Sequence, residues 1–238
     1  MTKGIFVTGT DTGVGKTVVS ALIIAALKRQ GIKVGAMKPV ETGCERRGNV
    51  LLPADGLFLR TVSSMSDPLE LITPVRYELP LAPFVAESEE GMTLDLHNVF
   101  DAYKALSSKY EFMVVEGVGG VMVPLTRRNG SFGSAYFVAD LIADLGLQAV
   151  VVGRPVLGTI NHILVTVSCL LARGIRVAGV IISYGSPPDG SVAERTNPQA
   201  LKDLCPVPII GTIPHISDVS PEAVWNLDVF IDIETLKQ

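Results

Sequence analysis

The feature that most constrains this chain is a regular alternation of short apolar runs with amphipathic stretches. Most of the runs are β-branched and unbroken, which is typical of parallel strands covered on both faces. They comprise residues 4–8, 33–38, 112–116, 148–153, 175–183 and 209–213. Three intervening stretches repeat apolar side chains at helical spacing and end at Gly31, Gly146 and Gly174, where a left-handed cap can precede the next strand. The alternation predicts one doubly wound α/β domain over residues 1–238, with helices on both faces of a mostly parallel sheet.

The least regular part of the chain is the proline-rich segment 40–83. Its spacing predicts one short helix near residues 55–64 inside a long loop. Because long loops in α/β domains often carry substrate contacts, we expect functional residues here.

Composition excludes several classes of protein. Of the 238 residues, 47% are hydrophobic and the formal net charge is −4, so disorder is excluded and a large nucleic-acid footprint is disfavoured. Each apolar run is interrupted well short of the ~20 residues that a membrane-spanning helix needs. Cys44, Cys169 and Cys205 are widely spaced and form neither a disulfide framework nor a zinc motif. With no export signal before the first strand, we expect a cytoplasmic protein with reduced, mostly buried thiols.

The segment GTDTGVGKT, residues 9–17, matches the phosphate-binding loop G-x-x-x-x-G-K-[ST] and lies between an apolar strand and an amphipathic helix. Its backbone N–H groups and the helix dipole would hold phosphate oxygens. Lys16 would reach the β- and γ-phosphates, and Thr17 would bind Mg²⁺. The pattern predicts nucleotide binding by Gly13, Val14, Gly15, Lys16, Thr17 and Val18.

Two missing motifs and one substituted position narrow the class of P-loop protein. The GTPase motifs D-x-x-G and N-K-x-D do not occur, and Asp11 stands where partitioning ATPases carry an additional lysine. A nucleotide-gated switch is therefore the disfavoured alternative to an enzyme.

Charged and polar groups follow several predicted strands, at the edge where α/β sheets bind ligands. Glu116 ends an apolar strand before a Gly-rich stretch interpreted as a flexible turn, and it is a candidate Mg²⁺ ligand. Lys38 offers a second ammonium for phosphoryl transfer. Asp55 is either a metal ligand or a helix N-cap, and the sequence alone favours the cap. Asn161 and His162 open a helix and are interpreted as capping residues or as part of a carboxylate site.

Taken together, these segments resemble the dethiobiotin synthetase family. The resemblance rests on GTDTGVGKT, KPVETG, VVEGVGG, LGTINH and IIGTIP in this order. It implies a homodimeric P-loop enzyme that uses ATP and Mg²⁺ to insert CO₂ between the vicinal amines of 7,8-diaminononanoate. A carbamate and a carbamic–phosphoric anhydride would be intermediates. Phosphorylation of the carbamate would release ADP, and ring closure would release phosphate.

The same resemblance assigns roles to individual residues. Lys38, Lys16 and Thr12 would be catalytic, and Mg²⁺ would lie on Thr17, Asp55 and Glu116. The substrate would contact Thr42 and, at a helix N-terminus of the other subunit, Gly158, Thr159, Ile160 and Asn161. The nucleotide would also contact Gly117, Val118, Gly119, Ser183, Ile213, Pro214 and His215.

Two further expectations concern the base and the assembly. Ser183 stands where many family members have an asparagine that reads the adenine edge, and serine is too short for that bidentate contact. We therefore hypothesise that the enzyme accepts other nucleotides or reads adenine through residues 211–215. The helix near residues 159–173 is apolar on more than one side, which predicts that part of it forms the dimer interface.

Overall fold

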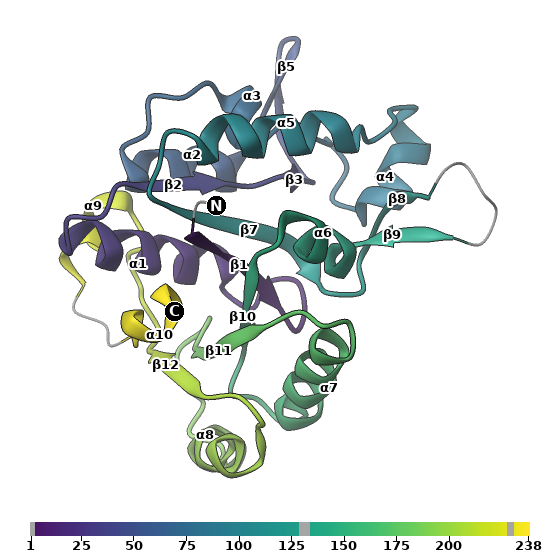
Figure 1. Cartoon of the computed structure of the whole chain (residues 1–238). Helices are drawn as coiled ribbons and strands as arrows, with labels where there is room; N and C mark the ends of the chain where they lie inside the picture. The colour runs from purple at the N-terminus through teal and green to yellow at the C-terminus, as the bar shows by residue number, and fades with distance from the viewer. Residues whose placement is uncertain (1–2, 129–133, 228–230) are drawn as a thin grey trace.

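The computed structural model describes residues 3–128, 134–227 and 231–238. Within this part of the chain, the centre is a six-stranded parallel sheet in the order β12-β11-β10-β1-β7-β2 (Figure 1). Its strands are β1 (Lys3–Gly9), β2 (Val34–Met37), β7 (Phe112–Gly120), β10 (Gln148–Gly153), β11 (Val177–Ser183) and β12 (Ile209–Ile213). The predicted parallel sheet is confirmed, and each strand overlaps one of the predicted runs.

Helices cover both faces of this sheet. Helix α1 (Lys16–Arg29) contacts β1, β2 and β7, whereas α6 (Val138–Leu145) contacts β7 and α7 (Thr159–Ala172) contacts β10 and β11. In Figure 1, α1 lies on one side of the sheet and α6 and α7 lie on the other. The remaining helices of the carboxyl-terminal part are α8 (Val192–Leu204), which packs on α7, and α9 (Pro221–Asn226) and α10 (Ile233–Lys237), which pack on α1.

The segment between β2 and β7 contains more regular structure than the sequence pattern predicted. The predicted short helix is confirmed as α2 (Ala54–Ser63), but short strands and a second helix replace the expected loop. They are β3 (Val40–Glu41), β4 (Glu45–Arg47), β5 (Val50–Leu52), α3 (Leu69–Ile72) and β6 (Val75–Arg76). Helices α4 (Pro83–Glu90) and α5 (Leu96–Ser107) follow, and the hairpin of β8 (Pro124–Arg127) and β9 (Ala135–Phe137) comes after β7.

The interpretation of residues 117–120 as a flexible turn is wrong. These residues continue β7, and Gly120 is paired with Gly9 of β1. Hydrogen bonding to a buried neighbour therefore outweighs the low strand propensity of glycine. As a result, Glu116 lies inside a strand whose first six residues are buried.

Parallel strands bring their carboxyl ends to one edge of the sheet, so segments far apart in sequence meet there. The loop after β1, Lys38 after β2 and Glu116 in β7 all lie at this edge, because β7 is the shared neighbour of β1 and β2. The core beneath is continuous, with fully buried side chains such as Phe6, Ile24 and Val114.

Two further predictions from the sequence concern membrane-spanning helices and the cysteine thiols. In the described part of the chain, no helix has the length and hydrophobicity of a membrane span. All three cysteines are free thiols, but the prediction that they are mostly buried is wrong, because Cys169 and Cys205 are partly exposed and only Cys44 is buried.

Candidate active site

The phosphate-binding loop connects β1 to α1, as the sequence predicts. Gly13 and Gly15 adopt φ angles of 72° and 93°, which L-residues with a side chain rarely adopt. A Cβ on Gly15 would also lie 2.6 Å from the Ser183 hydroxyl oxygen. Since no side chain among the described residues caps α1, its first N–H groups remain available to an anion such as phosphate.

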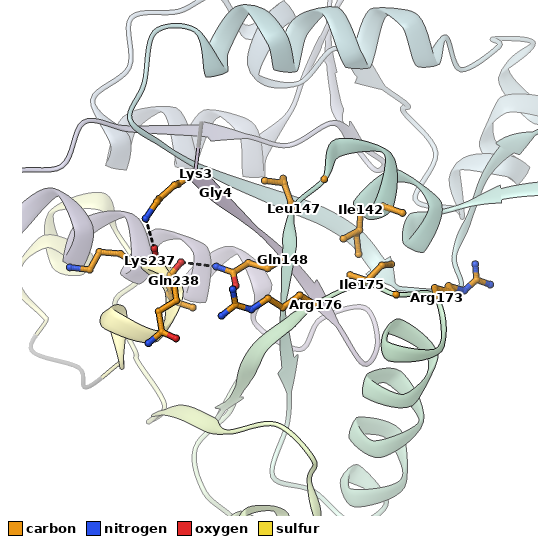
Figure 2. Close-up of a pocket in the computed structure, with 14 residues that line it drawn as sticks. Lys3, Gly4, Ile142, Leu147, Gln148, Arg173, Ile175, Arg176, Lys237 and Gln238 are labelled. Atoms are coloured by element: carbon orange, nitrogen blue, oxygen red, sulfur yellow. Dashed lines mark hydrogen bonds between the residues drawn. The ribbon is translucent and has the colours of Figure 1, made fainter. Parts of the chain in front are cut away.

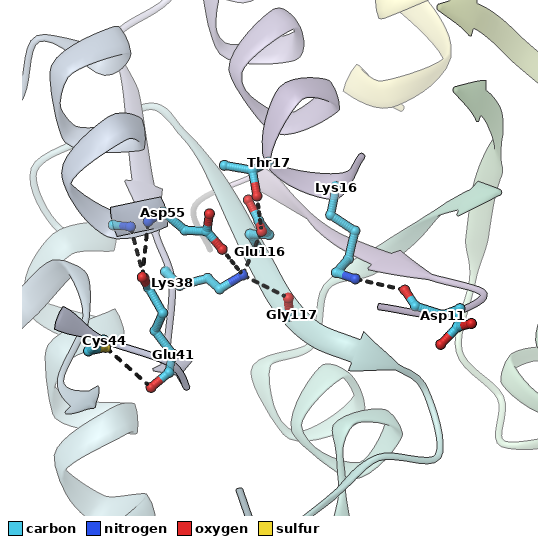
Figure 3. Close-up of polar contacts among 10 residues, drawn as sticks. Asp11, Lys16, Thr17, Lys38, Glu41, Cys44, Asp55, Glu116 and Gly117 are labelled. Carbon is cyan, nitrogen blue, oxygen red and sulfur yellow. Dashed lines mark hydrogen bonds and ion pairs between the residues drawn. The ribbon is translucent and has the colours of Figure 1, made fainter. Parts of the chain in front are cut away.

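Lys16 folds back over this loop. Its Nζ donates to the backbone oxygen of Asp11 at 2.9 Å, and the residue is 7% exposed (Figure 3). Burial, together with the nearby charge of Lys38, lowers the pKa of Lys16 to about 8. The ammonium therefore lies where a bound phosphate would stabilise its charged form.

Beside the loop, Lys38 binds two carboxylates at once. Its Nζ lies 2.5 Å from Glu116 Oε1, 2.9 Å from Asp55 Oδ2 and 3.2 Å from the backbone oxygen of Gly117. Thr17 donates its hydroxyl to the same Glu116 Oε1 at 2.9 Å. The three residues predicted to bind Mg²⁺ are thus brought together with the predicted catalytic lysine (Figure 3).

The electrostatics of this cluster follow from its burial. Lys38 is 3% exposed, and burial alone would lower its pKa, but the charges of Glu116 and Asp55 outweigh that effect and raise the pKa above its usual range. Burial likewise opposes ionisation of Asp55, yet Lys38 holds the pKa of this carboxyl below its usual range. Lys38 and Asp55 are therefore both charged at neutral pH.

The carboxylate and hydroxyl groups suit a Mg²⁺ ion. Glu116 is fully buried, and its second oxygen, Oε2, has no hydrogen-bond partner among the described residues. Such an orphaned buried oxygen is costly unless a ligand satisfies it. No group of three or more His, Cys, Asp and Glu side chains forms a metal cluster within the described ranges, and Mg²⁺ commonly takes one or two carboxylates together with substrate phosphates and water.

The interpretation of Asp55 as a helix cap is wrong. The N-cap of α2 is Pro53, which has no side-chain acceptor, and Asp55 lies two residues later in the first turn, with its carboxylate turned to Lys38. The cap comes instead from Glu41 of β3, whose Oε1 and Oε2 accept from the N–H groups of Asp55 and Gly56, each at 3.0 Å. Burial and the neighbouring Asp55 charge raise the pKa of Glu41 to about 7.

Sequence reasoning did not identify Glu41. The available signal was indirect: a helix that begins after Pro53 leaves its first N–H groups without a local acceptor, so an acceptor from elsewhere is required.

A cavity of about 490 Å³ opens beside the phosphate-binding loop. Thr12 lines it together with Asn161 and His162 of α7, and Met122 and Val165 contribute apolar side chains. The structure thus brings the predicted residues Thr12 and Asn161 to one cavity. Gly158, Thr159 and Ile160 begin the same helix, but Thr159 is buried, and none of the three lines the cavity.

A smaller cavity of about 230 Å³ lies at the ends of β11 and β12. Pro214 and His215 line it together with Tyr184, Glu194 and Arg195. A Cβ on Gly185 would be 3.8 Å from the Gly13 backbone oxygen, so this region adjoins the phosphate-binding loop. Ser183 and Ile213 pair at the ends of their strands, and Thr42 follows β3 as a partly exposed residue.

Another cavity, of about 470 Å³, lies at the opposite end of the sheet (Figure 2). It is lined by the amino-terminal end of β1, by Gln148 and Arg176, and by the last residues of the chain. It contains none of the predicted site residues. Since α/β sheets bind ligands at the carboxyl ends of their strands, this cavity is not the candidate active site.

A parallel sheet of this order, with a phosphate-binding loop after its first strand and carboxylates at the adjoining strand ends, defines a P-loop nucleotide-binding enzyme. A family described as an AAA domain matches residues 3–223. Among solved structures, the septum site-determining protein MinD from Pyrococcus horikoshii, complexed with Mg-ADP, has a TM-score of 0.55 at 17% identity and covers 100% of this chain and 94% of its own. At that identity the likeness shows the fold alone.

Curated relatives narrow the class further. The ATP-dependent dethiobiotin synthetase of Thermodesulfovibrio yellowstonii is 45% identical over 237 residues, covering 99% of both chains. The enzyme of the same name from Bacillus subtilis strain 168 is 39% identical and covers 94% of this chain and 93% of its own. That of Methanocaldococcus jannaschii is 45% identical and covers 75% and 78%. The chain belongs to the dethiobiotin synthetase family, and it is an ATP-dependent ligase of biotin biosynthesis.

Proposed function

We propose that this enzyme inserts CO₂ between the vicinal amines of 7,8-diaminononanoate and closes the ureido ring, with ATP as the energy source. The observation that carries the proposal is the cluster in which Lys38 joins Asp55 and Glu116 beside the phosphate-binding loop. Two ammonium groups and two carboxylates at the end of a phosphate-binding loop suit phosphoryl transfer to an oxygen nucleophile.

The proposed reaction has three steps. One amine attacks the carbon of CO₂ and loses a proton, which gives a carbamate. A carbamate oxygen then attacks the γ-phosphorus of ATP, the bond to the β–γ bridging oxygen breaks, and ADP leaves. The second amine attacks the carbonyl carbon of the carbamic–phosphoric anhydride, loses a proton and expels phosphate as the ring closes.

Each charged residue has a defined part in this scheme. Lys16 would bind the β- and γ-phosphate oxygens, since its ammonium already lies against the loop. Lys38 would stabilise negative charge on the transferring phosphoryl group and the carbamate, because preformed charge in a buried site acts strongly on charge that develops there. Thr12, at the cavity beside the loop, would contact the carbamate.

Mg²⁺ would be held by Thr17, Asp55 and Glu116. When bound, it would neutralise charge on the β- and γ-phosphate oxygens. The unpartnered oxygen of buried Glu116 supports this ligand set. In the structure, Lys38 neutralises the same two carboxylates and keeps them in place.

For the rest of the nucleotide, we propose two groups of contacts. The phosphates would contact the loop and the neighbouring end of β7, and the base would lie near the cavity at the ends of β11 and β12. The residues are Gly13, Val14, Gly15, Val18, Gly117, Val118 and Gly119 for the phosphates, and Ser183, Ile213, Pro214 and His215 for the base.

Base selectivity is expected to be weak. Ser183 is buried, and its hydroxyl lies close to Gly15 of the loop rather than in the small cavity. We therefore expect CTP and GTP to support turnover at rates comparable with ATP. Turnover with each nucleotide measures this, and a strong preference for ATP would remove the hypothesis.

The substrate and the assembly are linked in this proposal. Thr42 and the residues Gly158, Thr159, Ile160 and Asn161 would bind the diamine and its distant carboxylate, with α7 supplied by the second subunit of a homodimer. Several large apolar side chains on or beside α7 are exposed, among them Leu157 by 88%, Val165 by 60% and Met122 by 47%. Covering this surface with a second copy would remove it from water, which supports a homodimer. The cytoplasm remains the proposed location of the enzyme.

The direct test measures phosphate release from ATP with and without diaminononanoate and bicarbonate. The proposal expects release only when both are present, together with one dethiobiotin per phosphate. Slow hydrolysis of ATP that does not depend on the diamine would favour the alternative, a nucleotide-gated switch.

A further inference from the structure

Glu41 caps a helix to which it does not belong. Helix α2 begins after Pro53, and the first N–H groups of any helix need acceptors from outside it. Both oxygens of the Glu41 carboxylate fill this need, because Oε1 accepts from the N–H of Asp55 and Oε2 from that of Gly56, each at 3.0 Å. The cap is therefore placed 14 residues before Asp55 in sequence, on another element.

Capping a helix with a buried carboxylate costs more free energy than capping it with an exposed one. Glu41 is 5% exposed, and burying a carboxylate costs free energy even when it is hydrogen-bonded. A local residue does the same work in α5, where exposed Asp95 accepts from the N–H of His97 at 2.9 Å. Because an exposed local residue can cap a helix, the contrast indicates that the buried position of Glu41 has a role beyond capping.

Glu41 belongs to the same short segment as Lys38. The segment is fixed by backbone hydrogen bonds, from Lys38 N–H to the Ile72 oxygen at 2.8 Å and from Tyr77 N–H to the Glu41 oxygen at 2.9 Å. The Glu41 side chain then fixes the first turn of α2 against this segment. From that turn Asp55 reaches back to Lys38 Nζ at 2.9 Å, so a closed ring of contacts joins the three residues (Figure 3).

The start of α2 has little freedom to lie elsewhere. A Cβ on Gly56 would be 2.0 Å from the Thr73 hydroxyl oxygen, so the helix packs against the segment before β6 at closer range than any side chain allows. The Glu41 carboxylate and this close packing together define where the first turn of α2 lies.

We propose that Glu41 is a positioning residue that sets the Asp55 carboxylate in place for Mg²⁺ and Lys38. The inference rests on the proposed function, in which Asp55 is a Mg²⁺ ligand. When a residue that orients a metal ligand is altered, metal affinity commonly falls by about 10–100-fold.

The test compares ADP affinity by calorimetry with excess Mg²⁺ and with EDTA. In Glu41→Gln one oxygen still accepts an N–H, whereas the amide NH₂ faces the other N–H as a second donor. We expect the ratio of metal-free to Mg²⁺-saturated Kd to fall by about tenfold or more, while the metal-free Kd stays within about twofold because the phosphate-binding loop is untouched. Glu41→Asp keeps the charge on a shorter side chain, so it should give an intermediate ratio, and it serves if Glu41→Gln does not fold.

Two further variants separate positioning from stability. Asp95→Ala removes the side-chain cap of another helix, α5, so it should lower the melting temperature and leave the Kd ratio unchanged. Asp55→Asn should lose the Mg²⁺ effect directly, and adding Glu41→Gln to it should cause no further loss, because both act through one carboxylate.

Three results would overturn the inference. If Glu41→Gln lowers only the melting temperature, as Asp95→Ala does, Glu41 is a structural cap. If the effects of Glu41→Gln and Asp55→Asn add, Glu41 does not act through Asp55. If the unaltered enzyme binds ADP equally well with and without Mg²⁺, the metal site of the proposed function fails and Glu41 has no metal ligand to position.

Discussion

Replacing Lys38 by methionine tests both the chemistry and the electrostatics of the site. The Lys38 residue is 3% exposed, and its ammonium lies 2.5 Å from the fully buried Glu116 and 2.9 Å from Asp55. Lys38→Met keeps an unbranched side chain that is one atom shorter, and it removes the ammonium with its charge and its hydrogen bonds to Glu116 and Gly117. It therefore leaves Glu116 as a buried carboxylate without its cationic partner.

The magnitude follows from that burial. Removing one partner of a buried ion pair costs about 3–5 kcal/mol. We expect the lower end of this range, about 3 kcal/mol, because Thr17 still donates to Glu116 and because Asp55 is 39% exposed and its pair is screened by water. For a chain of this length, this corresponds to a fall in melting temperature of roughly 6–12 °C.

The assay is thermal unfolding of Lys38→Met, Glu116→Gln and the double variant, with ring closure measured in parallel. The double variant should recover most of the lost stability, since it removes the unpaired charge, yet it should remain inactive. This separates the loss of chemistry from the loss of stability. The reasoning is refuted if Lys38→Met melts as the unaltered protein does, or if the double variant melts no higher than Lys38→Met.

Further predictions concern stability, assembly and the loop. Although burial opposes it, hydrogen bonds from Lys109 and Tyr110 hold the pKa of Asp67 below its usual value of 3.8, so its contribution to stability is present above that pH and is lost as the pH falls through the folded-state pKa. Asp67→Asn should therefore flatten the curve of unfolding free energy against pH below about pH 4. Val165→Glu, on the exposed face of α7, should give a monomer by light scattering, and a dimer of unchanged affinity would contradict the assigned interface. Gly15→Ala, at φ 93°, should cost about 1–2 kcal/mol and remove the thermal shift caused by ADP, whereas an unchanged shift would show that the loop conformation does not matter.

The sheet and the phosphate-binding loop were predictable because their signals are local. Unbroken β-branched runs indicate buried parallel strands. The phosphate-binding motif GTDTGVGKT is recognised from the spacing of the residues within it. The Gly-rich stretch after Glu116 misled the prediction. Its glycines indicate a turn, but pairing of Gly120 with Gly9 keeps them in β7, and that pairing depends on strand order.

The candidate site was predictable only in part, because its contacts join distant segments. Lys38 and Glu116 are 78 residues apart, and only the adjacency of β2 and β7 brings them together. Their positions after predicted strands made both residues candidates, and the family resemblance assigned their roles. For Asp55 the sequence alone favoured a capping role, and only the resemblance assigned it to Mg²⁺. The true cap, Glu41, lies on another element, and a side chain that acts across the fold leaves no periodic signal in the sequence.

The most direct test of the proposed function follows the product and phosphate together. Purified enzyme with ATP, Mg²⁺, bicarbonate and 7,8-diaminononanoate should form dethiobiotin, detected by mass spectrometry, with one phosphate released per ring closed and no release when the diamine is left out. Phosphate release that does not depend on the diamine, or consumption of ATP without dethiobiotin, would contradict it.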